Sequence, residues 1–173
     1  MDKENNPADE HLMDWLRDAH AMEEQAETML TSMAGRIENY PEVHQRIQRH
    51  IEETRGQQRL VRQCIERRGG DTSALKDLAG KITATFQGFS GALASDEILK
   101  GAMFSFAFEN LEVAAYRQLV AAARYVGDTE TAEVCAGILK EEIAMAEWLD
   151  HNSDALVRLF LERANNPGEQ AKR

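Results

Sequence analysis

Four long segments of this chain carry apolar residues at alternating spacings of three and four, the pattern of a helix with one buried face. Proline, which breaks helices, occurs only three times in 173 residues, at Pro7, Pro41 and Pro167. The pattern therefore predicts four long helices, each with one apolar stripe. Such stripes are buried when helices pack side by side, so we expect an all-α bundle.

Residues that start and stop helices suggest where these segments end. We expect helices over 8–35, 41–68, 95–127 and 128–151, and a fifth, shorter helix over 153–164. Ser95-Asp96 is a capping sequence for the third helix, and Asp128 or Thr129 caps the fourth.

The segment between the second and third helices is long and contains both glycines and apolar residues. We expect a short helix from Thr72 within this connection, which spans residues 69–94. Two antiparallel hairpins joined by one long crossover form a ferritin-like antiparallel four-helix bundle. The whole chain, 1–173, is then a single domain with flexible tails at 1–7 and 165–173.

Charge and cysteine content exclude several classes of function. The 30 acidic residues outnumber the 20 basic ones, which gives a net charge of −10 and leaves no electrostatic surface for nucleic acid or anionic lipid. Two cysteines are too few for a disulfide scaffold and indicate a reducing, cytoplasmic location. The N-terminal residues have no signal-peptide pattern, and no apolar run is long enough to span a membrane.

Glutamates interrupt the apolar stripe of all four long helices, although unpaired carboxylates are rarely buried. Residue 38, in the first turn, is equally far from Glu23 and Glu53, and residue 127 is equally far from Glu112 and Glu142. At ~1.5 Å per residue each acid lies roughly 20 Å from its turn, near the middle of the bundle. Glu109 lies one turn before Glu112 and faces the same way.

Carboxylates gathered at one level repel one another unless they are protonated or a cation neutralises them. Oxygen-rich clusters suit iron, manganese or magnesium. The residues that we predict as metal ligands are Glu23, Glu53, Glu109, Glu112, Glu142 and His50. The alternatives stay open: a glutamate can reach the surface or bond a neighbour, and His50 or His20 can be a hydrogen-bonded core residue. Tyr116 either bonds a ligand or is a core tyrosine.

The order Glu23, Glu53, Glu109-x-x-Glu112, Glu142 resembles the rubrerythrin branch of the ferritin-like proteins. Gly56 and Met145 stand where that branch has its two histidine ligands. The chain is more similar, over residues 12–162, to the YciE/YciF-type bacterial stress proteins, above all to their YciE members. The segments that carry this likeness are 14–23, 50–54, 95–98, 109–114 and 141–142. This resemblance implies a cytoplasmic homodimer with a role in stress, and implies no particular reaction.

Three functions fit these observations. The first is a di-metal oxidoreductase, with two iron or manganese ions handling peroxide or oxygen. The second is a non-enzymatic dimeric stress protein with a vestigial, weakly metal-binding acidic core. The third is iron storage, which requires assembly into a shell. The sequence contains no cysteine-rich iron module, so an oxidoreductase of this kind needs an electron donor from another molecule.

Overall fold

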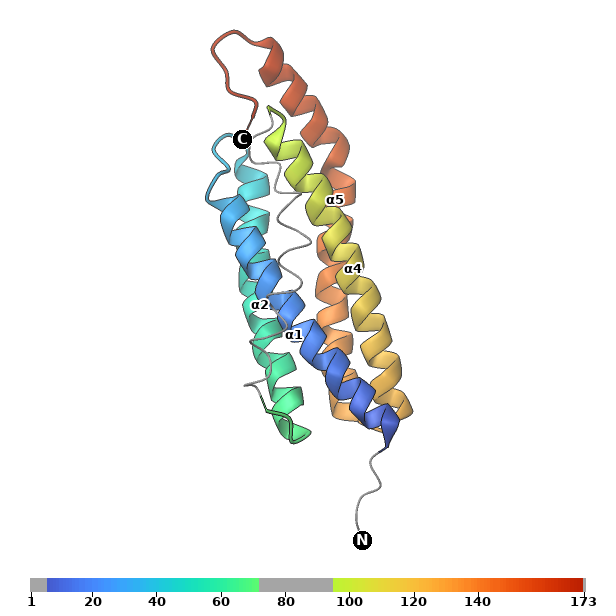
Figure 1. Cartoon of the computed structure of the whole chain (residues 1–173). Coiled ribbons are helices and arrows are strands. Elements are labelled where there is room, and N and C mark those ends of the chain that lie inside the picture. The colour runs from blue at the N-terminus through green and yellow to red at the C-terminus, as the bar shows by residue number, and fades with distance from the viewer. Residues whose placement is uncertain (1–5, 72–94, 173) are drawn as a thin grey trace.

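The computed structural model describes residues 6–71 and 95–172, which form four long helices and no strand. The helices are α1 (Pro7–Ala34), α2 (Pro41–Arg67), α4 (Glu97–Tyr125) and α5 (Thr129–Asn165). Hairpin α1–α2 lies beside hairpin α4–α5 (Figure 1). The predicted all-α four-helix architecture is confirmed, whereas the predicted short helix from Thr72 lies outside the described residues.

One predicted boundary is wrong, because the helix expected to end at His151 continues without a break. Helix α5 runs over 37 residues, and no separate fifth helix begins at Ser153. No glycine or proline lies between His151 and Asn165, and the Asn152 side chain donates to the Trp148 carbonyl oxygen at 2.8 Å without displacing the helix. Polar residues that often end helices are here accommodated on the helix surface.

The capping residues behave as predicted at one helix and differently at another. Asp128 is the N-cap of α5, and its side chain accepts a hydrogen bond from the Thr131 backbone N–H at 3.1 Å. Asp96 precedes α4 but makes no capping bond, because its carboxylate pairs with Lys100 at 2.9 Å. Gly127 adopts a φ of 78° in the α4–α5 turn, a conformation that favours glycine.

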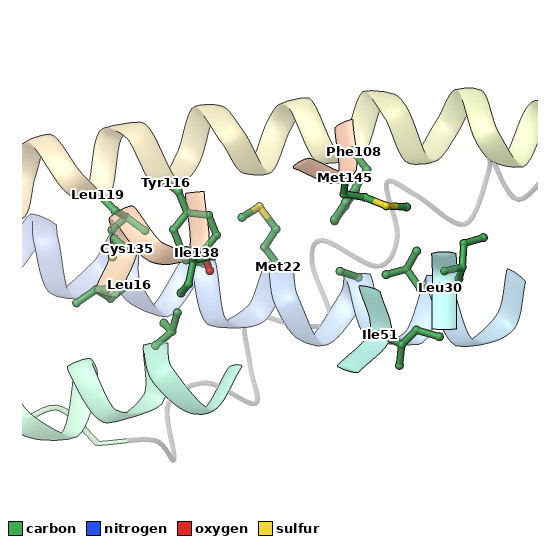
Figure 2. Packing of buried hydrophobic residues seen from close by; sticks show 14 of the residues in the cluster. Leu16, Met22, Leu30, Ile51, Phe108, Tyr116, Leu119, Cys135, Ile138 and Met145 are labelled. Carbon is green, nitrogen blue, oxygen red and sulfur yellow. The ribbon is translucent and has the colours of Figure 1, made fainter. Parts of the chain in front are cut away.

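The interior holds a continuous set of apolar side chains drawn from all four helices (Figure 2). Helix α1 packs mainly against α2 and α4, and α5 packs mainly against α4 and α2. None of the helices in the described ranges is both long and apolar enough to cross a membrane.

The C-terminal residues, which we expected to be flexible, contact the end of the bundle where α4 begins (Figure 1). The Tyr40 hydroxyl donates to the Ala171 carbonyl oxygen, and the Ile98 backbone N–H donates to the Lys172 carbonyl oxygen at 3.0 Å. These bonds connect the tail to the start of α2 and of α4.

Candidate metal centre

Four buried residues from three helices meet at mid-bundle. His50 comes from α2, Glu109 and Glu112 from α4, and Glu142 from α5, and each offers one ligand atom within 4.8 Å of the others. All four side chains are inaccessible to solvent or nearly so. A cluster of three carboxylates and one imidazole of this size can hold a metal ion.

The carboxylates at this centre have fewer hydrogen-bond donors than oxygens. Within the described part of the chain, one oxygen of Glu109 and one oxygen each of Glu112 and Glu142 have no donor, and the other oxygen of Glu109 faces only His50 Nε2, at 3.0 Å. A buried carboxylate oxygen without a partner is costly, because it loses its hydration and gains nothing in return. A cation between these oxygens would remove that cost, and the donor set fits one.

The electrostatics of the centre reflect the crowding of acids. Burial, and next the charge of Glu23, raises the pKa of both Glu112 and Glu142 well above the usual range of a carboxyl. Burial also raises the pKa of Glu23 to about 8. In the metal-free protein at neutral pH these groups therefore hold protons, which a metal ion would displace.

His50 lies between the carboxylates. Its Nδ1 is 2.8 Å from an oxygen of Glu53, and its Nε2 is 3.0 Å from Glu109 and 3.6 Å from Glu142. Burial lowers the pKa of His50, but the contacts with Glu109 and Glu53 outweigh burial and raise it to about 10. Protonated, His50 balances part of the negative charge. Neutral, it can bind metal through Nε2 while Glu53 orients the ring through Nδ1.

Glu53 lies at the solvent side of the centre rather than inside the four-residue group. Its side chain is 28% exposed and also accepts a hydrogen bond from Arg46 at 3.1 Å. Burial alone would raise the pKa of Glu53, but His50 and Arg46 hold it below its usual value. The buried row of α2 runs through His50, Thr54 and Gln57, and Glu53 flanks this row.

Glu23, from α1, is fully buried and also lies outside that group. One of its oxygens accepts a hydrogen bond from the Tyr116 hydroxyl at 2.5 Å, and the other has no partner within the described ranges. Tyr116 thus bonds one of the predicted ligands. The predicted ligands therefore form a central cluster with Glu23 and Glu53 at its margins.

Several residues that we did not predict as ligands complete the surroundings. Arg46 is nearly buried and lies one helical turn before His50. Its position in the buried row of α2 is the sequence signal that could have identified it as part of the site. Gln57 donates to Glu142 and, at 2.9 Å, to Glu141. His20 is buried away from the cluster, 3.9 Å from Glu24, and neither ring nitrogen makes a hydrogen bond to a described residue.

The chain as a whole is similar to known proteins. The sequence model of a family described as "Domain of unknown function (DUF892)" matches residues 7–162. A solved protein from Xanthomonas campestris pv. campestris is 43% identical over 92% of this chain and 99% of its own, with a TM-score of 0.78.

Two further solved structures are similar at lower identity. A putative structural protein, YcfI, from Rhodopseudomonas palustris is 24% identical over 87% of this chain and 97% of its own, with a TM-score of 0.66. The Escherichia coli stress protein YciF is 21% identical over 87% of this chain and 97% of its own, with a TM-score of 0.68. These last two likenesses establish the same fold.

Proposed function

The chain belongs to the DUF892 family, and on that premise we propose that it is a stress-associated protein whose buried carboxylates bind two iron or manganese ions that handle peroxide or oxygen. The observation that carries this proposal is the group of orphaned carboxylate oxygens on Glu109, Glu112 and Glu142. Buried acids without hydrogen bonds destabilise a fold, and a cation is the partner that this donor set suits.

Two ions, rather than one, are favoured by the number of carboxylates. The four-residue group suffices for one ion. Glu23 adds a fully buried carboxylate, one oxygen of which has no hydrogen-bond partner among the described residues. Helical bundles support two-metal sites in which glutamates from facing helices project inward. When bound, such ions supply redox capacity and an open coordination position for a small oxidant.

Neighbouring side chains would hold the ligands in place. Tyr116 restrains Glu23, and Gln57 restrains Glu142. Arg46 and Glu53 orient His50 from the solvent side. Such outer partners fix the orientation and basicity of ligands, so they belong to the proposed site.

A stress role and a cytoplasmic location are further parts of the proposal. They rest on the family resemblance and on the shared fold with YciF, which is described as a stress protein. The cytoplasmic location also agrees with the buried, free thiols of Cys64 and Cys135.

We further propose a homodimer formed through the outer face of α4. This helix carries apolar residues on its outer side as well as its inner side, and large apolar side chains remain exposed at Met103 (67%), Phe106 (39%) and Leu111 (48%). No charged residue lies on this outer stripe between Lys100 and Arg117. In a chain of net charge −10, such a stripe is a surface where two copies can meet without bringing carboxylates together.

A non-enzymatic stress protein is the second candidate, favoured by His50. As an imidazolium among carboxylates, this residue supplies an internal positive charge that stabilises the centre without metal. The acidic core would then be a relic that binds metal weakly.

A turnover assay separates the two candidates. Protein loaded anaerobically with iron(II) or manganese(II) is mixed with hydrogen peroxide or oxygen, and oxidant consumption is followed beside Glu142→Gln. Glu147→Gln, an exposed residue of the same helix, is the matched control. The proposal expects consumption by the wild type and by the control but not by Glu142→Gln. Equal rates for all three proteins would exclude the site from the reaction.

A further inference from the structure

The two cysteines come from different hairpins yet face the same level of the core. Arg67 bonds the Thr131 hydroxyl at 2.6 Å, and Gln57 bonds Glu141 at 2.9 Å, which fixes the antiparallel register of α2 against α5. Interpolating between these two pairs places Cys64 opposite Val134, the residue next to Cys135 in the chain. Both thiols are free and buried, with exposures of 3% for Cys64 and 0% for Cys135.

The packing geometry of helices permits a bond between such residues. The axes of packed helices lie about 8–10 Å apart, and Cα atoms lie about 2.3 Å from each axis, so facing Cα atoms reach the about 4–7 Å range of a disulfide. Figure 2 shows Cys135 in the core region of Leu16, Leu119 and Ile138. This layer is separate from the metal centre, because Cys64 lies about 21 Å along α2 from His50.

The surroundings of the two thiols differ. Burial raises the pKa of Cys64 above its ordinary value, and the Thr131 hydroxyl and the partly exposed Arg67 guanidinium beside its sulfur offset only part of that rise. No cation or hydroxyl of the described residues lowers the pKa of Cys135. Burial, and next the proximity of Cys64, raises this pKa to about 12. One thiol therefore sits next to a cation and a hydroxyl at the rim of the core, and the other sits deeper.

We propose that Cys64 and Cys135 form a dithiol that reduces hydrogen peroxide and closes to a disulfide between α2 and α5. The Cys64 sulfur attacks one peroxide oxygen as its thiol gives up its proton, the O–O bond breaks, and the leaving hydroxide takes that proton, so that a sulfenic acid and one water form. The Cys135 sulfur then attacks the Cys64 sulfur, the S–O bond breaks, and a second water leaves. The dithiol loses two electrons and two protons, and one peroxide becomes two waters.

The test uses the full-length, metal-free protein, so that its outcome is independent of the proposed metal chemistry. The reduced protein is treated with equimolar hydrogen peroxide, and thiols are counted after denaturation. The intact mass and the non-reduced peptide map are then measured. We expect both thiols to disappear, the mass of two hydrogen atoms to be lost, and a Cys64–Cys135 cross-linked peptide to form. We also expect the oxidised chain to unfold at a higher temperature, because the bond joins the two hairpins.

Two variants assign the roles. In Cys135→Ser we expect a dimedone-reactive sulfenic acid at Cys64, and in Cys64→Ser we expect the Cys135 thiol to persist. Two free thiols in peroxide-treated wild type would overturn the proposal, as would higher oxides without a cross-link or a cross-link between two chains only. The wild-type measurement decides the matter even where a variant folds poorly.

Discussion

Replacing Glu23 by glutamine is expected to stabilise the metal-free protein at neutral pH, because the wild type must hold a proton on a buried acid. The pKa of Glu23 rises from 4.5 to about 8 on burial. At pH 7 the folded protein keeps this group protonated, whereas the unfolded chain ionises it. Ionisation in the unfolded chain contributes ~1.36 kcal/mol for each pH unit above the unfolded pKa of Glu23. At pH 7 it therefore favours the unfolded chain by about 3 kcal/mol.

Because the pKa of Glu23 is raised in the folded protein, its cost to stability increases with pH. The penalty is absent below the unfolded pKa, grows as pH rises, and levels off above the folded pKa. Glutamine cannot ionise, and its carbonyl oxygen can still accept the Tyr116 hydrogen bond. The advantage of Glu23→Gln should therefore be about 3 kcal/mol at pH 7 and fall to about 1 kcal/mol at pH 5.

Urea unfolding in the presence of a chelator, at pH 5 and pH 7, measures this difference. Glu147→Gln removes one exposed carboxylate and controls for the change in net charge. A Glu23→Gln variant that gains no stability between pH 5 and pH 7 relative to that control would refute the reasoning. Added metal should reverse the order, because the variant loses a ligand.

Three further predictions follow from contacts elsewhere. Asp128→Ala removes the N-cap of α5 and the partner of Arg67, so urea unfolding at pH 7 should show a loss of about 1–3 kcal/mol. Burial alone would raise the pKa of Asp128, but the hydrogen bonds that its carboxylate accepts outweigh burial and hold this pKa well below normal. The stability difference between wild type and Asp128→Ala should therefore shrink as pH falls into the acid range. Tyr116→Phe leaves Glu23 without its donor, and dialysis against a chelator should strip metal from this variant faster. Leu111→Lys places a charge on the outer face of α4, and light scattering should report a monomer at concentrations where the wild type is a dimer.

Helical periodicity was sufficient to predict most of the architecture. Alternating spacings of three and four define one buried stripe per helix, and glycines mark the turns, so four helices and all their ends except that of the last could be predicted within a few residues. The expected break between His151 and Ser153 was wrong, because the polar residues Asn152 and Ser153 do not end the helix. Their polar side chains lie on the surface of a helix whose apolar spacing continues.

The sequence was sufficient to predict the level of each glutamate along the bundle, but not the side of its helix on which each one lies. Equal distance from a turn correctly suggested that Glu112 and Glu142 share a level, and the structure brings both into the central cluster. Equal distance says nothing of which side of the helix faces inward. On α2 the buried row passes through His50 and Gln57, so Glu53 lies towards solvent.

The central claim is that the buried cluster binds metal, and equilibrium dialysis followed by elemental analysis tests it most directly. Metal-free protein is dialysed anaerobically against iron(II) or manganese(II), beside Glu112→Gln/Glu142→Gln and the exposed control Glu147→Gln. We predict about two ions per chain in the wild type and the control, and loss of both ions in the double variant. No bound metal in the wild type, or equal metal in all three proteins, would contradict the account.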